Sequence, residues 1–248
     1  MIHKKFIVYL FGIFLSSVCA LAASAEQWDY TGREGPEHWA ELNGHNLPCS
    51  SGSQQSPVDI AQTIEADLPS LQIRWKSGGG TMANNGHTIQ VDLAEGGTLI
   101  RGDERFRLKQ FHFHAPSEHR VEGKAFPMEV HFVHEDEEIG ILGVLSVFFV
   151  PGEANGAFAD LASAFPAHEG EQVSLHKVEL TGLLPDSLDY WLYEGSLTTP
   201  PCSEDVEWMI AVEPIEVDAA DIARFTALYS HNARPIRAPN RRFILRAD

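Results

Sequence analysis

The sequence predicts a mainly β fold: one domain with a large, twisted, mostly antiparallel central sheet and short helices at its periphery. Runs of apolar and β-branched residues with a period of two recur along the chain, and turns rich in glycine and asparagine separate them. An apolar content of 44%, with 14 Phe and 5 Trp, rules out a disordered chain. Residues 26–248 contain no repeat or linker, so we predict a single folded domain there.

The individual elements follow from these patterns in chain order. The predicted strands are Leu71–Trp75, Thr88–Leu93, Thr98–Arg101, Phe106–His114, Met128–His134, Ile139–Val150 and Val206–Val212. The turn signals between them include Gly78-Gly79-Gly80, Asn84-Asn85-Gly86 and Glu95-Gly96-Gly97. A helical period appears over Ala154–Phe165 and Asp218–Tyr229, and Asp218 is placed to cap the second helix.

Residues 1–25 have the pattern of a secretory signal peptide. Lys4 and Lys5 precede an apolar run over Phe6–Ala22, and Ala23-Ser24-Ala25 supplies a small-residue cleavage site. The alternative is a membrane anchor, because the run of about 17 residues is near the lower limit for a span. The cleavage site favours removal, which predicts an exported protein, periplasmic or secreted, with no membrane attachment.

Charge and cysteine content narrow the function. Cleavage removes two lysines and no acids, so the formal charge falls from −17 to −19. Such a chain is not expected to bind nucleic acid or anionic lipid, which both require basic patches. Cleavage also removes Cys19 and leaves Cys49 and Cys202, an even number that favours a disulfide in an exported chain. The alternative is two unrelated thiols.

Three histidines are placed to hold a metal. Side chains alternate along a strand, so His112 and His114 point the same way, and His131 can join them from a neighbouring strand. Three neutral imidazoles and one open position suit a catalytic Zn²⁺. Gln110 and Glu129 are two residues from ligands and could accept the second ring N–H. The alternative, for any single histidine, is an ordinary hydrogen-bonded side chain.

These runs are part of a wider similarity. Gln110-Phe111-His112-Phe113-His114, Ser117-Glu118-His119 and Glu129-Val130-His131 resemble the α-class carbonic anhydrases. The resemblance covers essentially the whole of residues 26–248, as a catalytic domain. Its further motifs are Gly35-Pro36-Glu37-His38-Trp39, Gln55-Ser56-Pro57-Val58-Asp59-Ile60, Asn84-Asn85-Gly86-His87, Gly195-Ser196-Leu197-Thr198-Thr199-Pro200-Pro201 and Asn240-Arg241.

The resemblance implies reversible hydration of CO₂ to bicarbonate by zinc-bound hydroxide, with weak esterase activity as a by-product. Zinc would be held by His112, His114 and His131, and their outer partners would be Gln110, Glu129 and the backbone carbonyl of Asn240. Thr198 would act as a gatekeeper bonded to Glu118, and His87 as a proton shuttle. The implied substrate wall is Val133, Val144, Leu197, Thr198, Thr199 and Trp208, and the implied proton path is Tyr30, Asn85 and Gln90.

The same resemblance implies inhibition by sulfonamides and anions, allows a homodimer, and agrees with a Cys49–Cys202 disulfide. Three alternatives stay open at this point. A non-catalytic member of the fold usually lacks a zinc histidine, whereas all three are present here. A different zinc hydrolase, such as an esterase, would need a roomier pocket. A secreted storage or structural protein would contain no metal.

Overall fold

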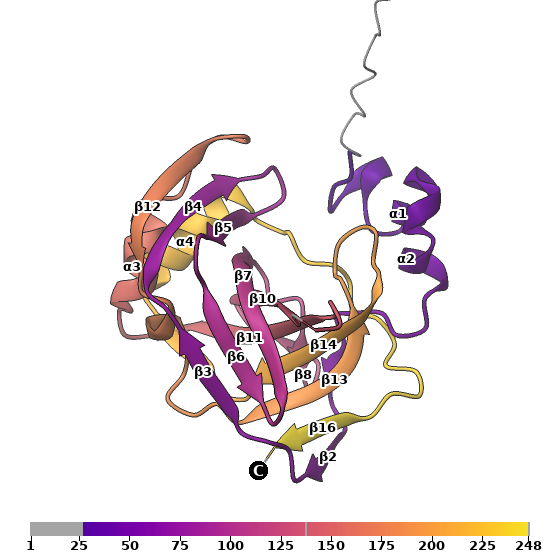
Figure 1. Cartoon of the computed structure of the whole chain (residues 1–248). Coiled ribbons are helices and arrows are strands. Elements are labelled where there is room, and N and C mark those ends of the chain that lie inside the picture. The colour runs from indigo at the N-terminus through magenta and orange to yellow at the C-terminus, as the bar shows by residue number, and fades with distance from the viewer. Residues whose placement is uncertain (1–26, 137, 248) are drawn as a thin grey trace, which may run out of the picture.

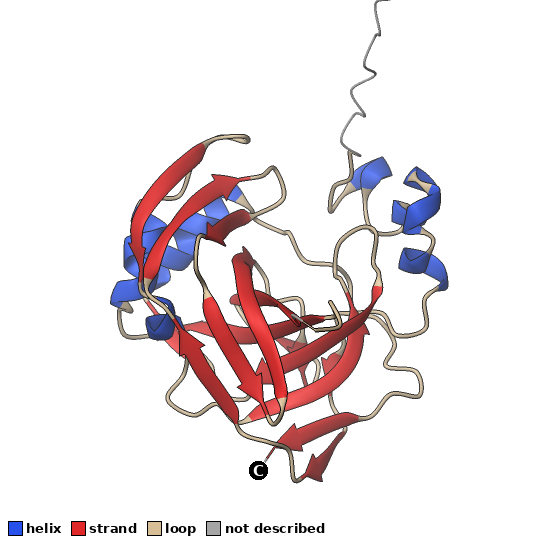
Figure 2. Ribbon diagram, in the orientation of Figure 1, coloured by secondary structure: helices blue, strands red, loops and turns tan. Residues whose placement is uncertain are grey.

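The computed structural model describes residues 27–136 and 138–247, so the predicted signal peptide and Cys19 lie outside the described residues. A twisted sheet of thirteen strands dominates this part of the chain, and the helices lie at its periphery (Figures 1 and 2). None of the helices in the described ranges has the length and apolar character needed to cross a membrane. The predicted fold class is confirmed.

The main path of the sheet runs β12-β4-β5-β7-β10-β11-β14-β13-β16-β2, with β3, β6 and β15 attached beside it. Most neighbours are antiparallel, but β11 pairs in parallel with β14 and β15, and β16 pairs in parallel with β2. The strands of this sheet are β2 Thr63–Ala66, β3 Leu71–Trp75, β4 Gly78–Asn84, β5 Ile89–Leu93, β6 Gly97–Arg101, β7 Glu104–His114, β10 Met128–Asp136, β11 Leu142–Pro151, β12 Gln172–Val178, β13 Tyr190–Ser196, β14 Glu204–Ala211, β15 Ile215–Val217 and β16 Ile244–Ala247. A small second sheet holds β1 Asp59–Ile60, β8 Arg120–Val121 and β9 Lys124–Ala125.

Within residues 27–247, leaving out residue 137, four short α-helices flank the sheet. The two predicted helices are present as α3 Gly156–Ser163 and α4 Ala219–Leu228 and pack together on one side, while α1 Trp39–Leu42 and α2 Pro48–Ser51 lie at the opposite end (Figure 1). Single 3₁₀ turns occur at Gly32–Glu34, Gly44–Asn46 and Leu180–Leu183. Asp218 caps α4 as predicted, because its carboxylate accepts from the Ala220 N–H at 2.8 Å.

All seven predicted strands are present, but the glycine run at residues 78–80 was wrongly interpreted as a turn. It begins β4, which lies between β12 and β5. A Cβ atom at Gly80 would stand only 2.6 Å from the carbonyl oxygen of Asp92, so the small residue allows the strands to approach. The strands β2, β12, β13, β15 and β16 of the main sheet were not predicted.

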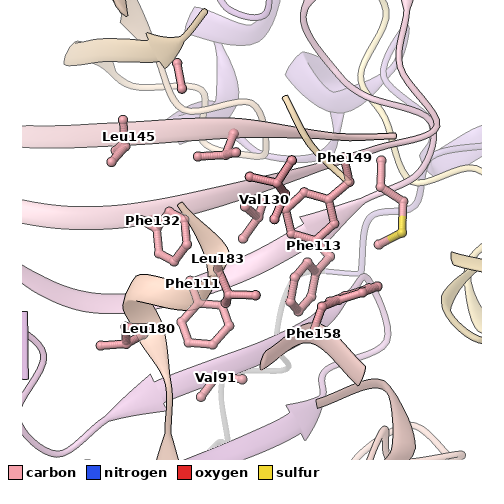
Figure 3. Packing of buried hydrophobic residues seen from close by; sticks show 14 of the residues in the cluster. Val91, Phe111, Phe113, Val130, Phe132, Leu145, Phe149, Phe158, Leu180 and Leu183 are labelled. Carbon is pink, nitrogen blue, oxygen red and sulfur yellow. The ribbon is translucent and has the colours of Figure 1, made fainter. Parts of the chain in front are cut away.

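The core lies under one face of β7, β10 and β11, where buried aromatic side chains interlock (Figure 3). Phe111 and Phe113 come from β7, and Val130 and Phe132 from β10. The register between β7 and β10 shifts by one residue. Val133 is opposite Gln110, but His134 is opposite Leu108, so Lys109 is an extra residue that forms a bulge in β7. This bulge lies next to the face that carries the histidines.

The segment that carries α1 and α2 is tied to the rest of the chain by a disulfide. Cys49 and Cys202 are bonded with an S–S distance of 2.06 Å, which confirms that prediction. The buried Trp39 indole donates to the carbonyl oxygens of Asp29 and Glu34, both at 2.9 Å. The guanidinium of Arg234 lies over the Trp39 ring at 5.5 Å. These contacts hold the N-terminal segment beside the loop that contains residues 198–201.

Candidate metal centre and active site

The three predicted histidines converge. His112 and His114 project from β7, and His131 lies directly opposite His112 on β10. One ring nitrogen from each of the three lies within 4.8 Å of the others. Period-two alternation and the strand register together create this group, because the intervening Phe113 turns into the core.

Each ring binds a protein acceptor through its other nitrogen. His112 Nδ1 lies 2.9 Å from Gln110 Oε1, and His131 Nε2 lies 2.8 Å from Glu129 Oε1. His114 Nδ1 lies 2.7 Å from the backbone carbonyl oxygen of Asn232. The prediction that Asn240 supplies this carbonyl is therefore wrong.

Asn240 is exposed and lies elsewhere, where its side-chain Nδ2 donates to the carbonyl oxygen of Ser53 at 2.7 Å. The error has a simple physical cause. A backbone carbonyl has no side-chain signature, and an asparagine beside an arginine is too short a pattern to determine which asparagine follows α4 into the site. Asn232, two residues before Arg234, is the residue that does so.

The donor set fits a metal ion that binds neutral imidazoles. His114 Nε2 is completely buried and has no hydrogen-bond partner among the described residues. Burial lowers the pKa of His114 to about 4, and burial likewise lowers the pKa of His112 and of His131. All three rings are therefore neutral near pH 7, and each presents a lone pair at the common point. This is the state in which histidine ligates zinc.

Glu129 forms the centre of the hydrogen-bond network beneath the ligands. Its buried carboxylate accepts five hydrogen bonds: from the backbone N–H groups of Glu118 and His119, from the rings of His119 and His131, and from the Ser146 hydroxyl. Burial by itself raises the pKa of Glu129, but the two histidines outweigh it and bring this pKa well below its ordinary value. His119 continues the network to the Tyr193 hydroxyl at 2.6 Å.

A second buried carboxyl, Glu118, faces the gatekeeper candidate. Its Oε1 accepts from the Arg234 backbone N–H at 2.8 Å. Burial raises the pKa of Glu118 to about 7, although His131, the Arg234 N–H and the Thr198 hydroxyl all act to lower it. Thr198 thus lies near Glu118, but Glu118 Oε2 has no hydrogen bond of normal geometry among the described residues, so the bond between the two stays a prediction.

The pocket above the three histidines has a volume of about 280 Å³. Every residue predicted for the wall and for the proton path lines it: Val133, Val144, Leu197, Thr198, Thr199 and Trp208 for the wall, and Tyr30, Asn85, His87 and Gln90 for the path. The structure adds Trp28, Thr88 and Leu142, which the sequence reasoning missed. Apolar and polar side chains thus both surround the space above the histidines.

Comparison with known proteins agrees with this geometry. The sequence pattern of the eukaryotic-type carbonic anhydrases matches residues 34–244. The carbonic anhydrase of Pectobacterium atrosepticum is 40% identical over 228 residues, which cover 91% of this chain and 93% of that protein. The chain belongs to the carbonic anhydrase family. The solved α-carbonic anhydrase of Thermovibrio ammonificans, in complex with the inhibitor sulfanilamide, superposes with a TM-score of 0.86 at 40% identity, covering 89% of this chain and 99% of that one.

Carbonic anhydrases interconvert CO₂ and bicarbonate, and this chain catalyses that reaction. The predicted enzyme class is therefore confirmed. Dioscorin, solved in complex with ascorbate, also superposes, with a TM-score of 0.84 at 27% identity over 89% of this chain. The three converging histidines, one of them with a buried unpaired nitrogen, are what link this carbonic anhydrase to metal chemistry.

His87 stands at the mouth of the carbonic anhydrase pocket. Its ring stacks on Trp28 with the centroids 3.7 Å apart and the planes 8° from parallel. Burial lowers the pKa of His87, and the carboxylates of Asp29 and Glu169 act in the opposite direction. The turn that carries it is closed by Asn85, whose Oδ1 accepts from the N–H groups of His87 and Thr88 at 3.0 and 2.9 Å. His87 is therefore held in a polar, partly solvated position.

Proposed function

We propose that this carbonic anhydrase works with one zinc ion held by His112, His114 and His131. The observation that carries the proposal is the convergence of three neutral rings, with the buried Nε2 of His114 left unpaired. When bound, zinc lowers the pKa of a ligated water to about 7, a figure established for carbonic anhydrases themselves. Gln110, Glu129 and the Asn232 carbonyl would fix the orientation of the three rings.

Glu118 and Thr198 would set the direction of attack on CO₂. In its ionised form Glu118 can only accept a hydrogen bond, so the Thr198 hydroxyl would then donate its proton to Glu118. The lone pairs of that hydroxyl would then face the pocket and orient a water there. CO₂ itself is apolar and would lie against the wall formed by Val133, Val144, Leu197 and Trp208, and Thr199 would contact the bicarbonate product.

His87 would carry away the proton that each hydration cycle leaves behind, with Tyr30, Asn85 and Gln90 lining the path. A group of pKa about 7, recaptured at ~10¹⁰ M⁻¹s⁻¹, releases protons to water at only ~10³ s⁻¹. Fast carbonic anhydrases reach roughly 10⁶ s⁻¹. A histidine of ordinary pKa near 6.5 accepts this proton almost isoenergetically and removes this limit. Burial lowers the pKa of His87 from that value, so its transfer would be somewhat less favourable.

The proposed zinc site and the disulfide also bear on the inhibitors and the location of the enzyme. Primary sulfonamides and small anions would bind at the metal and inhibit, as the Thermovibrio ammonificans relative solved with sulfanilamide suggests. Weak hydrolysis of activated esters would be a by-product of the same pocket. The Cys49–Cys202 disulfide and the predicted signal peptide at residues 1–25 support export, to the periplasm or out of the cell. The enzyme could form a homodimer, and analytical ultracentrifugation of the purified protein would measure its oligomeric state.

The zinc assignment is tested by replacing a ligand. His131→Ala should lose bound zinc, measured by plasma mass spectrometry, together with CO₂ hydration. The control is His176→Ala, which changes an exposed histidine on β12 and should keep both. A His131→Ala enzyme with full zinc content and normal hydration would contradict the proposal.

A further inference from the structure

Asn232 connects two parts of the pocket that are far apart in sequence. It lies in the segment after α4 and is 1% exposed. Its backbone carbonyl accepts from His114 Nδ1 at 2.7 Å, and its side-chain Nδ2 donates to the carbonyl oxygen of His87 at 3.0 Å. The same Nδ2 donates to the carbonyl of Phe113 at 2.9 Å, and Oδ1 accepts from the Ala115 N–H at 2.8 Å. One residue thus bonds both the proposed ligand and the proposed shuttle.

The backbone and the side chain of Asn232 perform separate tasks. The backbone carbonyl orients the His114 ring, and this bond survives any change of side chain. The side chain binds only main-chain atoms, on β7 at Phe113 and Ala115 and in the turn at His87. Asparagine suits this position because its short amide offers two donors and an acceptor together.

The turn that carries His87 depends on such outside support. Internally it is closed by Asn85, and Gly86 adopts a φ of +87° that favours glycine. Its ties to β7 come from the Thr88 hydroxyl, which donates to the Phe113 carbonyl at 2.6 Å, and from Asn232. The Asn232 bond holds the main chain of His87 itself, which is the pivot about which the imidazole turns.

We propose that Asn232 is a positioning residue for proton transfer, which sets the place of the His87 main chain relative to the metal ligand His114. This inference rests on the proposed role of His87 as the shuttle. Proton transfer through water depends steeply on the length of the path, and a displacement of about 1 Å can cost on the order of 10²-fold in rate. Asn232 is hydrogen-bonded to His114 at one end of this path and to His87 at the other, and so controls its length.

The test replaces the side chain and separates the two kinetic constants. In low buffer, Asn232→Ala should lower kcat about tenfold, a fraction of the loss attributed to a misplacement of about 1 Å. The value of kcat/KM and the zinc content should change less than about twofold, because the carbonyl to His114 remains and proton transfer is not part of kcat/KM. Tens of millimolar imidazole should restore most of kcat. Equal loss of kcat and kcat/KM, or loss of zinc, would overturn the proposal.

Two further variants distinguish a loss of positioning from a general loss of folding. Asn232→Ser keeps a hydroxyl that can bond one of the three main-chain partners and should give a smaller fall in kcat with the same imidazole rescue. Asn155→Ala is the matched control. That asparagine also donates to a carbonyl, of Gly182 at 2.8 Å, and accepts from an N–H, of Phe158 at 3.0 Å, but at the start of α3. It should lose stability and leave kcat unchanged; an equal fall of kcat in Asn155→Ala would overturn the proposal.

His87→Ala separates this inference from the function on which it rests. If His87→Ala leaves kcat intact in low buffer, the shuttle itself is wrong, and the role of Asn232 falls with it. If His87→Ala lowers kcat with imidazole rescue but Asn232→Ala does not, only the positioning role is wrong. The double variant His87→Ala/Asn232→Ala should show the kcat of His87→Ala alone; an additional loss would contradict the proposal.

Discussion

The floor and the mouth of the pocket are built in different ways. On the floor, three buried histidines stand on two adjacent strands, and Glu129 beneath them accepts five hydrogen bonds. At the mouth, His87 stands on a turn, stacked on the half-buried Trp28 of the N-terminal segment. Strand register fixes the floor, whereas the mouth is assembled from segments distant in sequence.

The difference indicates which substitutions this carbonic anhydrase tolerates and which it does not. A change on the floor leaves buried polar groups without partners, and such groups have a high energetic cost. A change at the mouth exposes side chains that water can solvate. We therefore expect floor substitutions to affect stability and metal binding, and mouth substitutions to affect these quantities little.

The largest effect is expected for Glu129→Gln. The amide cannot accept all five hydrogen bonds and removes the negative charge that accepts from the rings of His119 and His131. Leaving buried donors without an acceptor typically costs about 1–3 kcal/mol of unfolding free energy for each group, measured by urea denaturation. Zinc affinity should fall about 10–100-fold. Glu65→Gln, at an exposed position on β2, is the control; similar values for both variants would show that the floor is no more sensitive than the surface.

His134 tests the pH dependence of burial on the same strand, away from the ligands. Its Nδ1 lies 3.2 Å from the Gly143 carbonyl, the Trp75 indole donates to its Nε2, and burial lowers its pKa to about 4. The unfolded chain takes up this proton below pH 6.5, while the folded chain resists until about pH 4. Stability should therefore fall by about 3 kcal/mol between these values.

The measurement compares urea unfolding of the parent and of His134→Gln from pH 7 to pH 4. The parent should lose about 3 kcal/mol more than the variant over this range, because glutamine does not titrate. Parallel pH profiles for the two proteins would mean that His134 is protonated as easily in the folded state as in the unfolded one.

Thr198→Ala tests orientation on the floor without a change of ligand. We expect zinc content to be retained and CO₂ hydration to fall about 10²-fold, the usual cost of misaligned attack. Thr63→Ala, which removes an exposed hydroxyl on β2, should keep full activity. Unchanged hydration in Thr198→Ala would remove the gatekeeper role from the mechanism.

The smallest effect is expected at the mouth. Trp28→Leu removes ring contacts with His87, Tyr30 and Trp39, at centroid distances of 3.7, 5.3 and 5.3 Å. Because the indole is only half-buried, unfolding free energy should fall by about 1 kcal/mol, with zinc content unchanged. A loss as large as that of Glu129→Gln would show that the N-terminal segment is part of the structural core.

Sequence reasoning succeeded where local alternation carries the information. The strands β7 and β10 alternate histidine or acid with large apolar residues, so the ligands and their partners Gln110 and Glu129 could be predicted together. It failed for β4, because a run of glycines is typical of a turn, whereas here the missing side chains let neighbouring strands approach closely. It also missed β16, which pairs with β2 about 180 residues earlier in the chain.

The residues of the site that were assigned wrongly or missed also depend on contacts between distant parts of the chain. Asn232 acts on His114 through a backbone carbonyl, which any residue could supply, so no residue type points to it. Trp28 reaches the mouth only because the N-terminal segment is anchored by the Cys49–Cys202 disulfide and by Trp39. Contacts of this kind depend on the complete fold, and no pattern within one strand predicts them.

The extra residue in β7 has a consequence for how this enzyme tolerates insertions and deletions. Before Lys109, the even-numbered Phe106 and Leu108 face the core; after it, the odd-numbered Phe111 and Phe113 do. The extra residue Lys109 thus determines which side chains of the following residues face the core. Adding or removing one residue between Leu108 and Phe111 would exchange the faces of the following strand and bury the histidines where the phenylalanines now pack. Relatives that retain the chemistry should therefore keep the length of this stretch more strictly than its composition.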